Sequence, residues 1–229
     1  MEWGPVGAAA VAAEADVAVV VDVLSFTTTL TVAVERGMRV HPFRWKDERA
    51  GSYAAERDAV LAGPRGPGVS LSSAAMLEVS GVERIVLPSP NGSAISAGLA
   101  AGGATVVGAC LRNRLAVARW IPAGATVAVV PAGERWPDDT LRPAVEDLWG
   151  AGGVLAALVD LGHDGLSPEA RVAEQAFRAV AARLPDELRD CASGRELVAS
   201  GFGADVDVAA ALDASDVVPV LKGDAFVAD

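Results

Sequence analysis

The sequence is poor in the residues that carry the commonest metal and nucleophile chemistry. Of its 229 residues only two are histidine and two are cysteine. Cys110 and Cys191 are far apart and belong to no Cys-x-x-Cys pair, which excludes a zinc ribbon and a dithiol redox motif. We interpret both as small buried hydrophobic residues. His41 falls on an expected strand and His163 in a Gly-His-Asp-Gly turn, so structural or solvated roles are favoured over a histidine-based catalytic triad or zinc site.

Positive charge is also scarce. The chain has 19 basic and 30 acidic residues, a formal charge of −11, and its basic residues form no cluster. Nucleic-acid binding is therefore not expected, because phosphate backbones are bound by clustered cations. No apolar run approaches membrane-spanning length, and the N-terminus lacks the basic region of a signal peptide. We expect a soluble, cytoplasmic, globular protein with no membrane partner.

Two familiar phosphate motifs are incomplete. Residues 63–68 contain the glycines of a phosphate loop, but Val69 stands where that motif requires lysine. Asp22 ends a hydrophobic run, as the nucleophile of an aspartyl-phosphate enzyme would, yet the second aspartate expected two residues later is Leu24. An Asp-x-Asp pair that begins at Asp205 lacks the preceding strand, and we interpret it as the start of a helix.

The chain does have a recurring pattern of a short β-branched run, a turn, a stretch with helical apolar spacing and a glycine, which is typical of β-α units. The expected strands cover residues 17–21, 38–43, 85–87, 104–107, 125–130 and 217–221. We therefore predict an α/β fold with a mixed or mostly parallel sheet, helices on both faces and a helical C-terminal part. Residues 1–229 are expected to form one compact domain, or two closely packed halves with a boundary near residues 62–82.

Two helix starts carry recognisable signals. Pro143 is expected at the first position of a long helix, whose first turn then contains Glu146 and Asp147. Ser193 and Glu196 have the Ser-x-x-Glu spacing of a capping box.

Polar residues follow three of the expected strands, at Asp22, at residues 91–93 and at residues 133–134. Because strand ends in open α/β sheets face one crevice in which ligands bind, we expect these residues to converge. A hard oxygen-bound cation such as Mg²⁺ would suit the carboxylates that meet there. Those carboxylates are Asp22, Glu134, Glu146 and Asp147. The alternative for the last two is that they only complement a helix N-terminus; their expected closeness to Asp22 favours the metal site.

An anionic substrate needs local positive potential here, because a net charge of −11 repels it at long range. Backbone N–H groups, hydroxyls and amides at helix starts can hold phosphate oxygens. One of Arg112 and Arg114 is expected to face the crevice as well, the other being a solvated surface residue. The candidate substrate-binding residues from this reasoning are Ser25, Thr27, Thr28, Asn91, Ser93, Arg112 and Asn113.

Five segments in order form a distinctive series: VVVDVLSFTTTLTVAVERG, PNGSAIS, VVGACLRNRLAVA, VPAGE with the later VEDLWGAGG, and SGRELVASGFGADVDVAAALDASDVVPVL. This series resembles the 2-phosphosulfolactate phosphatase family, over a stretch from Val17 to Leu221. The resemblance implies an α/β fold and Mg²⁺-dependent removal of phosphate from 2-phospho-3-sulfolactate, a step of coenzyme M formation. It places the following residues on motif positions: Asp22, Thr27, Thr28, Asn91, Gly92, Asn113, Gly133, Glu146 and Asp147. Gly92 and Gly133 join the candidate substrate-binding residues on this ground.

Three departures from the family pattern bear on the substrate. Where the family usually has Arg-Ala after Asp-Val-Leu, this chain has Ser25-Phe26, which removes a cation beside the expected phosphate site. The family's glycine-rich segments are reduced to residues 63–66 and 71–73, in which Arg65 is the surviving charge, and its Thr-Thr-Asn-Gly-Thr motif becomes Ser-Pro-Asn-Gly-Ser. Loss of a forked guanidinium is expected to change substrate preference more than fold.

Two functional hypotheses follow. The first is a phosphoric monoester hydrolase acting on a small anionic phospho-acid, with Asp22, Glu146 and Asp147 as the catalytic and metal-binding residues. Water or Asp22 itself is the nucleophile. The second is a non-catalytic or repurposed member that binds a small phospho- or sulfo-acid, as the altered segments suggest. Clustered carboxylates favour catalysis, since a pure anion binder gains little from them. The sequence leaves the oligomeric state open, with a homodimer as the default for soluble oligomers.

Overall fold

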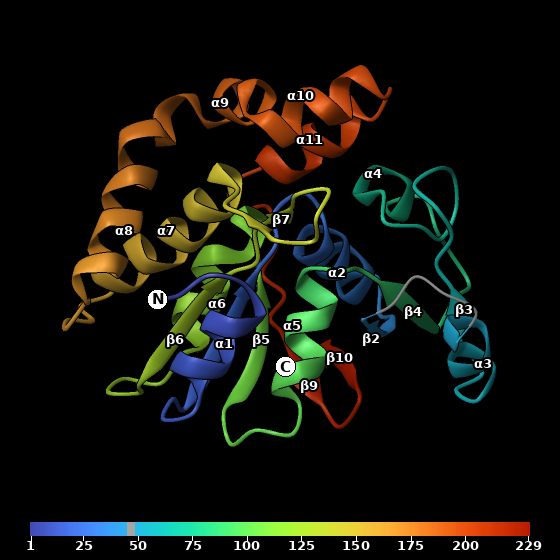
Figure 1. The fold of residues 1–229 in the computed structure, drawn as a ribbon, viewed down its shortest axis with the longest axis horizontal. Helices are drawn as coiled ribbons and strands as arrows, with labels where there is room; N and C mark the ends of the chain where they lie inside the picture. Colours follow the sequence, from blue (N-terminus) through green and yellow to red (C-terminus); the bar gives the residue numbers. More distant parts are fainter. Residues whose placement is uncertain (45–48) are drawn as a thin grey trace.

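The computed structural model describes residues 1–44 and 49–229. Its main strands are β1 (Val17–Val21), β2 (Arg39–Phe43), β3 (Val60–Leu61), β4 (Arg84–Pro88), β5 (Thr105–Ala109), β6 (Val127–Pro131), β9 (Pro219–Lys222) and β10 (Ala225–Ala228). They form one sheet in the order β3-β4-β2-β10-β9-β5-β1-β6, flanked by helices (Figure 1). A separate small hairpin consists of β7 (Glu134–Arg135) and β8 (Leu141–Arg142).

The helices follow the strands along the chain. The α-helices are α1 (Gly4–Ala12), α2 (Phe26–Glu35), α3 (Arg49–Ala55), α4 (Ser73–Met76), α5 (Gly92–Leu99), α6 (Arg114–Trp120), α7 (Val145–Asp160), α8 (Pro168–Val180), α9 (Leu184–Asp190), α10 (Ala192–Ala199) and α11 (Gly203–Ala210). Two 3₁₀ turns cover Leu111–Asn113 and Ala181–Arg183. In Figure 1 the helical C-terminal part begins with α8, which lies at the left beside α7, and continues with α9 to α11, which lie above the sheet.

The sheet is mixed, and its antiparallel part lies in the middle. β5, β1 and β6 are parallel to one another, as are β2, β4 and β3. The β9–β10 hairpin separates these groups and is antiparallel to β5 on one side and β2 on the other. The predicted α/β fold with a mixed sheet is confirmed, whereas β10 was not expected.

The ends of β1 and β4 meet although the two strands run in opposite directions when they are followed through the hydrogen-bonded order of the sheet. Parallel packing of neighbouring strands, which we had expected to gather the strand ends, therefore does not bring these two together. The contact is made by the turns that follow the strands, where the Gly92 N–H donates to the Asp22 carboxylate.

β1 is the centre of the core because it is buried on both faces. Val19 and Val21 pack in the cluster formed with α6, α7 and α8, whereas Val20 packs with α2 and α5. This alternation follows from the two-residue period of a strand. The continuous valine run, which predicted a strand covered on both sides, is thus confirmed, and β1 is a rigid base for the turn that follows it.

Both cysteines are free and buried, as expected, and Cys191 also caps a helix, which the sequence did not predict. Cys191 precedes α10, and its Sγ accepts a hydrogen bond from the Gly194 N–H at 3.3 Å. The expected capping box at Ser193 is wrong, because Ser193 lies inside the helix that Cys191 begins. Pro143 is likewise not the first helical residue, since α7 begins at Val145 after an extended Ala144.

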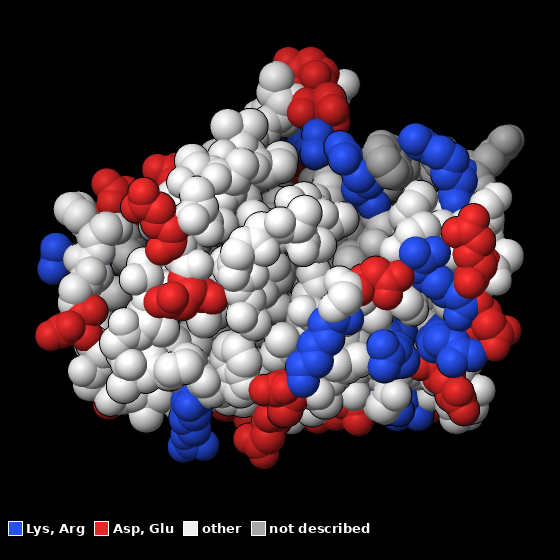
Figure 2. All heavy atoms as spheres, turned by 90° about the horizontal axis from the view of Figure 1, so that it is seen from below, with Lys and Arg blue, Asp and Glu red and all other residues white. Residues whose placement is uncertain are grey.

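The surface carries both signs of charge. On the face drawn in Figure 2, Lys and Arg side chains stand beside Asp and Glu side chains, next to a broad uncharged area. Exposed ion pairs on the molecule include Arg84 with Asp58. Among the helices of residues 1–44 and 49–229, none combines the length and the apolar character that crossing a bilayer demands.

Candidate functional site

Asp22 lies directly after β1, and two helix starts hold its carboxylate. Its Oδ1 accepts a hydrogen bond from the N–H of Phe26 at 3.0 Å, and its Oδ2 accepts one from the N–H of Gly92 at 2.8 Å. Phe26 and Gly92 are the first residues of α2 and α5. Both helices therefore direct the positive end of their dipoles toward this carboxylate, which is only 5% exposed.

Opposing effects act on the protonation of Asp22. Burial raises the pKa of its carboxyl, and the negative charge of Glu146 adds to this. The two backbone hydrogen bonds and the charge of Arg65 lower it, and the net direction is upward. The Asp22 carboxyl is therefore buried where the loss of water disfavours its ionised form. Carboxyls with pKa values shifted in this way are common at functional sites.

Asp147 connects the end of β1 with the end of β6. From the first turn of α7, its Oδ1 accepts a hydrogen bond from the Val23 N–H at 2.7 Å, and its Oδ2 accepts one from the Gly133 N–H at 2.8 Å. Gly133 has a φ of +68°, which a residue with a side chain adopts only with strain. Burial and the charges of Asp22 and Glu146 raise the pKa of Asp147 well above its usual range.

Glu134 is a third carboxyl and borders a cavity of about 380 Å³. Its Oε2 accepts a hydrogen bond from Asn91 Nδ2 at 2.9 Å. Burial, together with the charges of Asp22 and Glu146, raises the pKa of Glu134 to about 7, although the Asn91 bond opposes this. The cavity is also lined by Arg135, whose Nε donates to Asn91 Oδ1 at 3.3 Å. A group that titrates near neutral pH therefore faces a space that can hold a small ligand.

Glu146 completes the group of acids. It is 2% exposed, and its charge acts on Asp22, Asp147 and Glu134. It also lies against the thiol of Cys191, whose pKa is raised to about 12 by burial and by this carboxylate. The charge of Glu146 thus acts on the other three carboxyls that we expected to converge, and the charge of Asp22 acts on Asp147 and Glu134.

The arrangement suits a hard cation in part. All the donors are carboxylate oxygens, and a divalent cation would relieve their mutual repulsion. Each Asp22 oxygen accepts one backbone N–H and keeps a second lone pair. In residues 1–44 and 49–229, however, no three Asp, Glu, His or Cys side chains gather as ligands of one ion. The residues thus fit an Mg²⁺ ion held by one or two carboxylates and completed by water and substrate oxygens, as is usual for this metal.

Several hydroxyls that we predict to bind substrate form hydrogen bonds with the backbone of the turns. Thr27 Oγ1 accepts a hydrogen bond from the Asp22 N–H at 2.9 Å and donates to the Asp22 carbonyl at 2.7 Å. Thr28 donates to the Val23 carbonyl and Ser93 to the Leu87 carbonyl. These side chains are fully buried, and their hydrogen bonds stabilise the backbone of the turns that form the site. Ser25 differs, because its Oγ accepts a hydrogen bond from Arg65 Nη2 at 3.0 Å.

The residues after β5 also contact the backbone rather than the carboxylates. Asn113 Oδ1 accepts from the Cys110 N–H at 2.8 Å, and its Nδ2 donates to the Val217 carbonyl at 3.0 Å. Arg112 Nη1 donates to the Val208 carbonyl at 3.2 Å, and Arg114 pairs with Asp213 at 2.7 Å. Substrate binding by Arg112 and Asn113 stays a prediction, because these contacts do not test it.

Sequence reasoning missed two features of the site. Arg135 was not singled out, although it directly follows Glu134 and its Nη2 donates to the Pro90 carbonyl at 3.0 Å. Asp205 was correctly placed in the first turn of a helix, but its ion pair with Arg65 was not foreseen. A helix-start carboxylate gives no sequence signal of burial, and these two residues are 140 positions apart.

Comparison with known proteins places the chain among relatives. A sequence model of the family described as 2-phosphosulpholactate phosphatase matches residues 8–224. Proteins named "Probable 2-phosphosulfolactate phosphatase" are 33% identical in Deinococcus radiodurans, over 90% of this chain and 88% of the relative, and 31% identical in Carboxydothermus hydrogenoformans, over 90% and 87%. A protein of the same name from Thermus thermophilus is 33% identical over 91% of this chain and 89% of its own length. With the match spanning nearly the whole sequence, the chain belongs to the 2-phosphosulfolactate phosphatase family.

Proposed function

We propose that the protein is a phosphoric monoester hydrolase that converts 2-phosphosulfolactate and water into sulfolactate and inorganic phosphate. The names of its relatives support this substrate, and a place in coenzyme M formation belongs to the same proposal. The observation that carries the proposal is the convergence of four carboxylates, one of which, Glu134, borders a cavity and titrates near pH 7.

The reaction requires two proton movements at this site. A water oxygen forms a bond to phosphorus while the ester P–O bond breaks, so the water must lose a proton and the leaving oxygen must gain one. Because the attacking and leaving oxygens lie in line on opposite sides of phosphorus, one carboxyl can serve only one of these transfers, and the leaving oxygen takes its proton from solvent water. A carboxyl with a pKa of about 7 is suited to accept the proton of the attacking water at neutral pH. We assign this role to Glu134, which Asn91 holds by its Nδ2 hydrogen bond.

The geometry of Asp22 favours water over Asp22 as the nucleophile. Both oxygens of this carboxylate accept backbone N–H bonds, which stabilise its negative charge and so lower its reactivity toward phosphorus. We propose instead that Asp22 and Glu146 hold Mg²⁺. When bound, this ion would neutralise charge on the phosphoryl oxygens.

Phosphate release tests the proposal. 2-Phosphosulfolactate, 2-phospholactate and 3-phosphoglycerate are each assayed with Mg²⁺ or with a chelator, for the unaltered protein and for Asp22→Asn. Metal-dependent release that Asp22→Asn lowers by at least about 100-fold is the expected result. No release from any ester by a folded protein contradicts hydrolysis. Calorimetric binding of 2-phosphosulfolactate without Mg²⁺ in that case favours the second hypothesis, a non-catalytic binder.

A further inference from the structure

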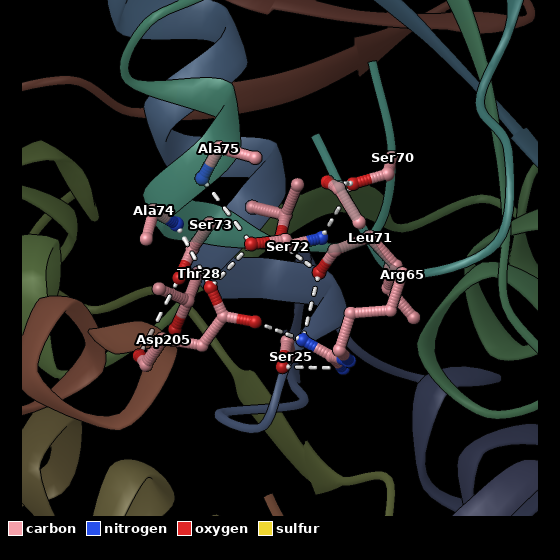
Figure 3. A network of polar contacts seen from close by, with 12 residues as sticks. Ser25, Thr28, Arg65, Ser70, Leu71, Ser72, Ser73, Ala74, Ala75 and Asp205 are labelled. Carbon is pink, nitrogen blue, oxygen red and sulfur yellow. Dashed lines mark hydrogen bonds and ion pairs between the residues drawn. The ribbon is translucent and has the colours of Figure 1, made fainter. Parts of the chain in front are cut away.

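Arg65 is held at the edge of the site by three parts of the chain. It lies in the loop between β3 and α4, and its Nη2 donates to Ser25 Oγ at 3.0 Å (Figure 3). Its Nη1 donates to the Leu71 carbonyl at 3.2 Å and to the Asp205 carboxylate, with which it forms an ion pair. Ser25 is three residues after Asp22, so this contact brings a cation to the turn that carries the site.

Asp205 is the centre of this network. It lies in the first turn of α11 and is 1% exposed. Its Oδ1 accepts hydrogen bonds from Ser72 Oγ at 2.6 Å and from the Ala74 N–H at 3.0 Å, at the start of α4 (Figure 3). Its Oδ2 faces Arg65. One carboxylate thus joins the C-terminal helices to the loop that presents Arg65.

The ion pair leaves Arg65 able to bind a further anion. A guanidinium has five N–H groups. Within residues 1–44 and 49–229, the contacts described above use three of those of Arg65, so two are left to bind a ligand. Arg65 also borders a cavity of about 500 Å³, together with Leu61, Leu71 and Pro88. Forked guanidinium donors match the oxygens of a sulfonate or carboxylate.

The position of Arg65 suits a part of the substrate that does not react. Its hydrogen bond to Ser25 brings it to the turn that begins at Asp22, and the cavity that it borders has a different lining from the one that Glu134 borders. An anionic group a few bonds away from the phosphorus would lie at Arg65, with the phosphate on the side of Asp22 and Glu134.

We propose that Arg65 binds the non-reacting acid group of the substrate, and that Asp205 is the positioning residue that holds Arg65 beside Ser25. This inference rests on the proposed phosphatase function and adds a recognition site for the sulfonate or carboxylate. It also accounts for Ser25 at this position, because its hydroxyl contacts a guanidinium that another loop supplies.

The test compares Arg65→Ala, Arg65→Lys, Asp205→Asn and the double variant Arg65→Ala/Asp205→Asn. Asp207→Asn is the matched control, because Asp207 lies on the same helix but pairs with the exposed Arg189. For each protein, kcat and KM for 2-phosphosulfolactate and 2-phospholactate are measured, as is the inhibition constant of inorganic phosphate.

Arg65→Ala is expected to raise KM for 2-phosphosulfolactate about 10- to 100-fold, the equivalent of one lost charge-assisted interaction. The inhibition constant of inorganic phosphate should change less than about two-fold, and Arg65→Lys should restore part of the loss. Asp205→Asn should raise KM in the same direction, and the double variant should be no worse than Arg65→Ala alone. An effect of Arg65→Ala on 2-phosphosulfolactate alone identifies the sulfonate as the group bound, and an equal effect on both esters identifies the carboxylate.

An unchanged KM in Arg65→Ala overturns the inference, as does a parallel rise in the inhibition constant of phosphate. Additive effects in the double variant overturn the positioning role of Asp205. If Asp205→Asn does not fold, Arg65→Ala and Arg65→Lys still decide the role of Arg65. If the unaltered protein releases no phosphate, the proposed function fails separately, and calorimetric binding of 2-phosphosulfolactate to it and to Arg65→Ala then decides the inference.

Discussion

The N–H of Gly92 donates to the carboxylate of Asp22 at 2.8 Å, although the two residues are 70 positions apart. This approach depends on the missing side chain of Gly92. A Cβ at this position would lie 2.8 Å from Asp22 Oδ2 and would overlap the ring of Phe26. The bond fixes the start of α5 against the end of β1.

Gly92→Ala is therefore expected to impair both folding and hydrolysis. The added methyl group must displace Asp22 or Phe26, both of which are buried, and overpacking of this kind typically costs about 1–3 kcal/mol. Urea unfolding should show this loss of stability, and phosphate release should fall with it.

Gly98→Ala is the matched control for this change. Gly98 lies on the same helix, α5, and a Cβ there meets nothing within 4 Å. Alanine in a helix interior should leave stability unchanged or raise it by about 0.5–1 kcal/mol. If both variants unfold at the same urea concentration, the close approach at Gly92 does not contribute to the stability of the protein.

Glu134→Gln is expected to change the pH dependence of stability. The pKa of Glu134 rises from 4.5 to about 7 on folding, so the folded protein holds this proton more tightly. The contribution of Glu134 to the free energy of unfolding is then greatest below about pH 4.5 and falls as the pH rises toward 7. Glutamine removes this penalty and still accepts the Asn91 hydrogen bond, so it should stabilise the protein by about 2–3 kcal/mol at pH 8 and by almost nothing at pH 4.5.

Urea unfolding at the two pH values measures this difference. Glu14→Gln removes a charge from an exposed position and should show no such pH dependence. An equal effect of Glu134→Gln at both pH values would mean that Glu134 does not titrate in the range given. The same variant should abolish phosphate release near neutral pH if Glu134 accepts the proton of the attacking water.

Cys191 should be unreactive in the folded protein. Burial and Glu146 raise the pKa of its thiol to about 12, and thiols react as thiolates. Iodoacetamide at pH 8 is expected to label Cys191 only after unfolding, as mass spectrometry can show. Labelling of the native protein within minutes would contradict the described packing.

The cap that Cys191 provides can be tested separately. Cys191→Ala removes the acceptor of the Gly194 N–H and should cost about 0.5–2 kcal/mol, whereas Cys191→Ser keeps an acceptor and should cost less. The order of the two urea midpoints checks this. Equal midpoints would show that the cap contributes nothing.

Sequence patterns predicted the elements that hydrophobic spacing defines. The valines of β1 and the first-turn position of Glu146 and Asp147 were found in this way. α1 was missed because its small residues, mostly alanine and glycine, form no apolar stripe. β10 was missed because four residues give too short a pattern.

The residues of the candidate site likewise fall into those that sequence patterns predicted and those that they did not. The carboxylates could be predicted because they follow strand ends or start a helix. The direction of a hydroxyl could not, since Thr27 and Ser93 turn inward to nearby carbonyls, a choice that depends on local backbone geometry. The pairing of Arg65 with Asp205 could not be predicted either, because it depends on how the C-terminal helices fold back over the sheet.

Phe226 joins the two halves of the sheet. It is fully buried, pairs with Val40 of β2 and packs edge-on against Phe26 at 6.4 Å between ring centroids. Phe226→Ala should cost about 3–5 kcal/mol of unfolding free energy. Val227→Ala, on the opposite and half-buried side of the same strand, should cost clearly less. Equal losses would contradict the central position of Phe226.

The place of the β9–β10 hairpin also sets the order in which the protein can assemble. During synthesis the ribosome releases β1 to β6 first, and β5 and β2 then have nothing between them until β9 and β10 emerge. Until that moment the nascent chain exposes two unpaired sheet edges, which are the surfaces through which strands of different chains join. A chain that stalls before Pro219 is therefore expected to be a substrate for chaperones, because β9 and β10, which follow the other strands of this sheet along the chain, join its two parallel groups into one sheet.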